Sequence, residues 1–76
     1  MTTPKERAED ARARAAESQQ DFRDATSDGE KSGAAGDPDG VQRARAAERR
    51  AIEKFDTAVV DHRKAMDDLK KATGAG

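Results

Sequence analysis

The stretch AIEKFDTAVVDHRKAMDDLKKAT, residues 51–73, decides the fold, because its large apolar residues recur in a regular pattern. These positions, together with one histidine, alternate steps of three and four residues, which is the a/d spacing of a coiled-coil helix. The seam consists of Ile52, Phe55, Val59, His62, Met66 and Leu69. Alanines stand beside it at every seventh position, namely Ala51, Ala58, Ala65 and Ala72. The pattern predicts a long amphipathic helix with a coiled-coil seam.

We predict that this helix spans residues 38–73. Asp37 can cap the first turn, and Pro38 suits the first helical position because its missing N–H is not needed there. Gly74 is the type of residue that ends a helix. Residues 74–76 are predicted to form a disordered tail.

A first helix is predicted within residues 1–28. Thr3, Pro4 and Glu6 have the spacing of a capping box with proline at the first helical position. The seam of this helix has the same alternating spacing, but all of its members except Phe22 are small. They are Ala8, Ala11, Ala15, Ser18, Phe22 and Ala25.

Residues 29–37 are rich in turn and breaker residues and are predicted to form a flexible hinge. Folding the chain there gives an all-α, antiparallel two-helix hairpin, and its small first seam allows the helices to approach closely. In the expected register, Phe22 lies near Ala44 and Ala8 lies near Ala58.

The two predicted helices differ in length. At 1.5 Å per residue the first is about 36 Å long and the second about 54 Å, so the chain has nothing to cover the second helix beyond His62. Met66 and Leu69 would then need another molecule, either a second copy or a different protein. Because twofold homodimers are the commonest assembly, a four-helix bundle of two hairpins is the simplest outcome.

The composition argues against an enzyme. A chain of 76 residues with so few large apolar side chains cannot enclose a water-excluding pocket. It has no cysteine for a nucleophile, a disulfide or a thiolate metal ligand, and no Gly-rich phosphate loop. We therefore expect no catalytic residue, no cofactor, no metal site and no small-molecule substrate.

The sequence also bears on location. No apolar run approaches the ~20 residues that cross a bilayer, and the first residues lack the apolar segment of a signal peptide. Acidic residues offset the basic ones on the amphipathic helix, which argues against binding to a membrane surface. We expect a cytoplasmic protein. Its abundant Ala, Arg, Asp and Gly, with Asn absent, are typical of high-GC bacteria and their phages.

Two features have alternative interpretations. Arg43, Arg45, Arg49 and Arg50 form either a solvated helix face or an anion-binding surface for nucleic acid, although no aromatic residue stands nearby to stack on a base. His62 is a register-setting polar residue, an exposed ring or a pH-sensitive contact. We expect no metal there, because a lone histidine needs further ligands.

These observations predict a non-enzymatic interaction or assembly protein, such as a scaffold, an adaptor or a small structural component. It would bind itself or a protein partner through the seam from Ile52 to Leu69. The alternative is a nucleic-acid-associated protein that uses the arginines between Arg43 and Arg50. A third alternative is a chain that is unstructured alone and folds only on its target.

Overall fold

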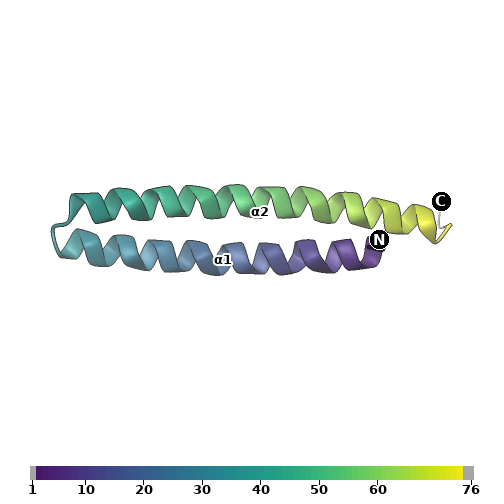
Figure 1. Ribbon diagram of the computed structural model, residues 1–76, viewed down its shortest axis with the longest axis horizontal. Coiled ribbons are helices and arrows are strands. Elements are labelled where there is room, and N and C mark those ends of the chain that lie inside the picture. Colours follow the sequence, from purple (N-terminus) through teal and green to yellow (C-terminus); the bar gives the residue numbers. More distant parts are fainter. Residues whose placement is uncertain (1, 75–76) are drawn as a thin grey trace.

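The computed structural model describes residues 2–74 and consists of two antiparallel helices, α1 (Pro4–Ala34) and α2 (Pro38–Ala72) (Figure 1). The predicted all-α hairpin is therefore confirmed. The helices lie side by side in a rod with extents of 58 × 19 × 13 Å. Within the predicted tail 74–76, only Gly74 belongs to the described residues.

The starts of both helices are capped as the sequence predicts. The Thr3 hydroxyl accepts a hydrogen bond from the Glu6 backbone N–H at 3.2 Å, and a proline follows the cap. The Asp37 carboxylate accepts one from the Gly40 N–H at 3.1 Å. Each bond satisfies one of the backbone donors that a helix start leaves without a partner.

Helix α1 is longer than predicted, because residues 29–34 of the expected hinge are helical. Gly29 lies against α2 so closely that an added Cβ would stand 3.2 Å from the Cβ of Ala44. Glycine weakens an isolated helix by about 1 kcal/mol, but packing against a second helix outweighs this preference. Gly29 and Gly33 are therefore helical residues and do not break α1 as predicted.

The connection between the helices is a tight turn. Gly36 has a φ of 69°, which is the left-handed conformation that favours glycine. The Gly36 N–H donates to the Gly33 carbonyl at 3.2 Å, and the Asp37 N–H donates to the Ser32 carbonyl at 2.8 Å. These two bonds are the Schellman motif that ends many helices. The predicted flexible hinge is thus a turn of defined geometry.

The short turn changes the register of the hairpin. Ala44 was predicted to lie beside Phe22 and instead lies beside Gly29, seven residues further along α1. A shift of seven residues is one heptad, so the same helix faces still meet.

The prediction that the two helices differ greatly in length is also wrong. Helix α1 has 31 residues and α2 has 35. Helix α2 is covered beyond His62, because Ala65 is only 1% exposed and Asp68 pairs with Arg7.

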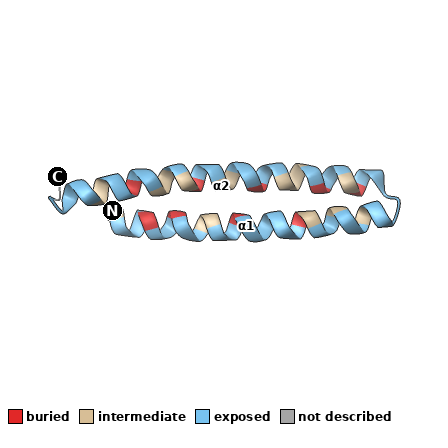
Figure 2. Cartoon of the chain, turned by 180° about the vertical axis from the view of Figure 1, so that it is seen from behind, coloured by how far each residue is buried: buried red, intermediate tan, exposed pale blue. Residues whose placement is uncertain are grey.

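The residues buried between the two helices (Figure 2) are small. The buried positions lie on the inner side of each helix, and Ala11 and Ala58 are fully buried at 0% exposure. The buried alanines and serine are Ala8, Ala11, Ser18, Ala25, Ala44, Ala51, Ala58 and Ala65. The heptad alanines Ala51, Ala58 and Ala65, rather than the large apolar seam of α2, therefore pack most closely against α1.

None of the described helices contains an apolar segment long enough to cross a lipid bilayer.

Candidate protein-interaction face

The large apolar side chains of the hairpin gather on one face. Successive residues of a helix are about 100° apart, so the residues that directly follow the buried Ala51 and Ala58 lie to one side of the helix contact. We call this side the apolar face. It consists of Phe22 from α1 and of Ile52, Phe55, Val59, His62, Met66 and Leu69 from α2.

This face is only partly covered by the hairpin itself. Ile52 is 48% exposed, Met66 38% and Phe22 37%, while Phe55 and Val59 are half-buried. Single exposed apolar residues are common on protein surfaces, whereas large contiguous groups of them are typical of interaction sites. All six residues of the sequence-predicted seam lie here, and Phe22 joins them from the other helix.

Two grooves run between the helices on this face. The first has a volume of about 380 Å³, and its lining includes Ser18, Phe22, Ala51, Ile52 and Phe55. The second has a volume of about 390 Å³, and its lining includes Ala11, Ala15, Phe55, Ala58, Val59 and His62. Because Phe55 lines both, the two grooves adjoin each other, and we call them together the central hollow.

Three arginines line the central hollow. Arg23 lines the first groove, and Arg12 and Arg63 line the second, with no Asp or Glu in either lining. Each of these arginines directly follows a seam position, so it lies about 100° further around its helix, at the edge of the hollow. Among residues 2–74, the three form no ion pair.

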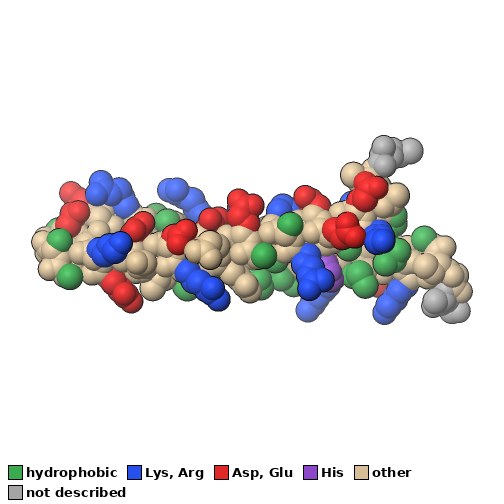
Figure 3. All heavy atoms as spheres, turned by 90° about the horizontal axis from the view of Figure 1, so that it is seen from below, with side chains coloured by type: hydrophobic (Ala, Val, Ile, Leu, Met, Phe, Trp, Pro, Cys, Tyr) green, Lys and Arg blue, Asp and Glu red, His purple; other side chains and the backbone are tan. Residues whose placement is uncertain are grey.

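The opposite face of the hairpin carries ion pairs that cross between the helices, and we call it the ion-pair face. Arg7 pairs with Asp68 at 3.0 Å, and Arg14 pairs with Asp61 at 3.0 Å. In Figure 3 most acidic side chains lie along the upper half of the rod, whereas basic side chains stand on both edges. Charge is therefore distributed unevenly between the two faces.

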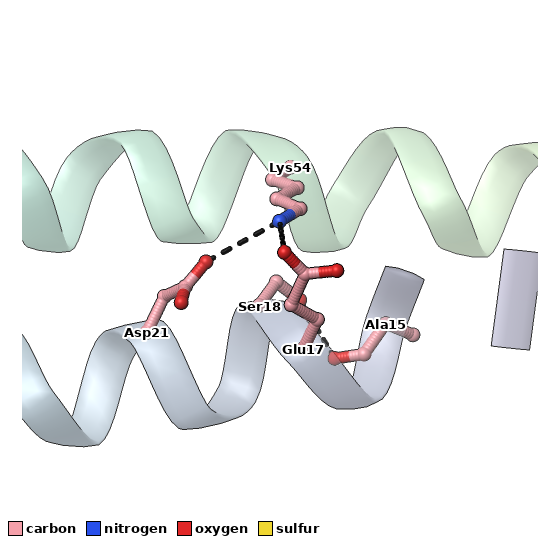
Figure 4. A network of polar contacts seen from close by, with 5 residues as sticks. All are labelled: Ala15, Glu17, Ser18, Asp21 and Lys54. Carbon is pink, nitrogen blue, oxygen red and sulfur yellow. Dashed lines mark hydrogen bonds and ion pairs between the residues drawn. The ribbon is translucent and has the colours of Figure 1, made fainter. Parts of the chain in front are cut away.

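Lys54 is the centre of a small network on the ion-pair face (Figure 4). Its ammonium group donates to the Glu17 carboxylate at 2.8 Å and to Asp21 at 3.3 Å. The hydrogen bond to Glu17 is the main reason why the pKa of Lys54 is raised above its ordinary value, with partial desolvation opposing it.

Arg14 behaves in the same way, because its hydrogen bond to Asp61 raises its pKa. Such exposed pairs each contribute little stability, but their positions favour the observed register over its neighbours.

A buried serine lies close to this network (Figure 4). Ser18 is 1% exposed, and its hydroxyl donates to the carbonyl of Ala15 at 2.7 Å. A buried hydroxyl satisfied within its own helix leaves no unpaired polar group in the helix contact. Ser18 therefore acts as one more small residue in the row of alanines.

The arginines between Arg43 and Arg50 do not form one patch. Arg43 lies 3.8 Å from Asp37, and Arg45, Arg49 and Arg50 are exposed. Arg49 and Arg50 are neighbours in sequence and so point about 100° apart around the helix. The cluster that the sequence shows is spread around α2.

His62 is half-buried in the lining of the central hollow. Within residues 2–74, no group of three or more His, Cys, Asp or Glu side chains could hold a metal ion.

Sequence reasoning missed the three arginines of the hollow and the exposure of Phe22. A signal was present, because Arg12, Arg23 and Arg63 each follow a seam position directly. Placing them at one hollow, however, requires the register, and the register depends on where the turn begins.

Comparison with protein-family models found no match, and comparisons with curated proteins and with solved structures found none either.

Proposed function

We propose that the chain is a non-enzymatic interaction module that binds a helix of a protein through its apolar face. The supporting observation is that Phe22, Ile52 and Met66 stay more than a third exposed on the face that carries the central hollow, although the hairpin is already packed. The row of buried alanines forms the centre of the helix contact, and these side chains lie beside it with much of their surface still exposed. A bound partner would therefore bury the exposed surface of Phe22, Ile52 and Met66.

The shape of the surface suits a helix as the ligand. Amphipathic helices bind in apolar grooves through side chains at spacings of three and four residues. The central hollow lies between the two antiparallel helices, so a third helix placed in it would contact both and complete a small bundle. Scaffold, adaptor and assembly roles all use contacts of this kind.

Two exposed aliphatic residues offer a matched test. Ile52 and Val60 are 48% and 49% exposed, but Val60 lies two residues after the buried Ala58, about 200° around the helix. We expect Ile52→Asp to abolish self-association or partner capture, whereas Val60→Asp leaves either intact. Sedimentation velocity over a dilution series measures the first, and affinity capture from the native host measures the second.

Equal behaviour of the two variants would contradict the proposal. The proposal would also be contradicted if the wild-type chain stayed monomeric and captured no protein that the Ile52→Asp variant fails to capture.

Binding of nucleic acid through Arg43, Arg45, Arg49 and Arg50 has less support, because these side chains point in different directions around α2. The dependence of binding on salt concentration distinguishes binding of nucleic acid from binding through the apolar face. Binding through phosphates weakens steeply as the salt concentration rises, whereas apolar contacts persist.

A further inference from the structure

The cations on the two faces of the hairpin have different surroundings. On the ion-pair face, Arg7, Arg14 and Lys54 each hold a carboxylate of the other helix within 3.0 Å. At the central hollow, Arg12, Arg23 and Arg63 have no such partner among residues 2–74. The apolar surface is therefore edged by uncompensated positive charge, which favours approach of an acidic surface.

The charge also disfavours a second copy as the occupant. Two hairpins joined through their central hollows would bring six arginines into one interface, and neither hollow has an Asp or Glu in its lining. Like charges brought together at an interface suppress that pairing. A partner surface that carries negative charge would avoid this repulsion between arginines.

We propose that the central hollow binds a single amphipathic helix of another protein, whose apolar stripe is flanked by Asp and Glu on both sides. This inference rests on the proposed function and names the chemistry of its partner. Arg12 and Arg23 stand on the α1 edge of the hollow, and Arg63 stands on the α2 edge. Acidic residues on both flanks of the bound helix would therefore meet a cation.

The spacing of the arginines sets the length of the partner. Arg12 and Arg23 are eleven residues apart in α1, which is about 16 Å or three helical turns. A partner helix must carry apolar residues over at least this distance to cover the hollow. Nearer the turn the charge changes, because Glu30 and Glu48 line a third groove with Arg45. The partner's acidic flanks should therefore end before that point.

The test uses two synthetic helical peptides of about 18 residues, or five turns. Both carry leucine at the a and d positions and alanine on the outer face, and they differ only in having Glu or Lys on the flanks. Binding of each labelled peptide to the full chain is measured by fluorescence anisotropy. We expect the Glu peptide to bind about tenfold more tightly, because three partly exposed ion pairs each add a factor of about two.

Two triple variants with the same change in net charge complete the design. Arg12→Glu, Arg23→Glu and Arg63→Glu together should reverse the preference, so that the Lys peptide binds more tightly. The matched control replaces three arginines away from the hollow by Glu and should keep the wild-type preference. Its positions are Arg43, Arg49 and Arg50. Circular dichroism verifies that both variants keep the helicity of the wild type.

Other outcomes separate this inference from the proposed function. If both peptides bind equally and Ile52→Asp abolishes both, the interaction module stands and the acidic partner is refuted. If neither peptide binds but the chain dimerises through the hollow, a second copy is the occupant and the inference is wrong. Binding to anionic vesicles that the Glu peptide does not displace also refutes it. If no ligand binds and the chain stays monomeric, both proposals fail.

Discussion

Larger apolar residues usually stabilise a helix contact. Because the contact here is a closely packed row of alanines, we predict instead that a larger apolar residue in it destabilises the hairpin. Ala58 is 0% exposed and lies with Ala11 in the helix contact. Replacing Ala58 by Leu adds three carbon atoms where the helices already touch. Overpacking of this kind costs about 1–3 kcal/mol, and the nearly equal helix propensities of Ala and Leu do not offset it.

Removing a large side chain from the apolar face should cost much less. Full burial of an isoleucine contributes about 1.5–3 kcal/mol, and Ile52 is 48% exposed, so Ile52→Ala loses about 1 kcal/mol of packing. Alanine's higher helix propensity returns a few tenths of a kcal/mol. The net loss for Ile52→Ala is therefore about half a kcal/mol, against about 2 kcal/mol for Ala58→Leu.

Urea denaturation followed by far-ultraviolet circular dichroism measures both values, at two protein concentrations so that self-association is recognised. With a slope of about 1 kcal/mol per molar urea, Ala58→Leu should lower the midpoint by about 2 M and Ile52→Ala by about 0.5 M. Ala13→Leu, the same substitution at an exposed position of α1, is the control and should leave the midpoint nearly unchanged.

The opposite ranking would refute the reasoning. If Ile52→Ala lowered the midpoint more than Ala58→Leu, the large apolar residues would hold the hairpin together. The apolar face would then not be free for a partner.

Two further predictions concern the turn and the ion-pair face. Gly33→Ala should stabilise the hairpin by up to about 1 kcal/mol, since the added Cβ would lie 4.0 Å from Val41 Cγ2. Gly40→Ala should destabilise the hairpin, since the added Cβ would lie only 2.9 Å from Ser32 Cβ. Thermal unfolding of the two variants gives opposite signs if the turn is as described. The raised pKa of Lys54 means that its stabilising contribution is complete below the ordinary pKa of 10.5 and is lost as the pH rises through the raised value. Urea midpoints of wild type and Lys54→Met should therefore differ at neutral pH and converge well above pH 10.5, and a difference that persists there would contradict the assignment.

The elements and their starts could be predicted from the sequence because the signals are local. The heptad spacing from Ile52 to Leu69 specifies a helix, and the caps at Thr3 and Asp37 are formed by residues a few positions apart. The end of α1 could not be predicted in the same way. Gly29 and Gly33 weaken a helix locally, and only the packing of α2 against them explains why the helix continues to Ala34.

That one error had limited consequences for the candidate site. It moved the pairing by one heptad, which keeps each residue on its own side of the helix, so Ile52, Phe55 and Val59 still share one face. The reason given for exposed apolar residues was nevertheless wrong. The sequence argument left only Met66 and Leu69 uncovered, because the first helix was expected to be short. In the structure Ile52 is exposed as well, because alanines occupy the contact line instead.

The turn links the two helices at one end of the rod, and nothing covalent joins them where α1 begins and α2 ends (Figure 1). Because the buried side chains are almost all alanines, each heptad adds a similar small increment of stability. A rod of this kind opens like a zipper, with local unfolding easiest at the unlinked end and hardest beside the turn. Fraying therefore reaches Met66 and Leu69 first, whereas Ile52 and Phe55 keep their places until about half of the hairpin has opened.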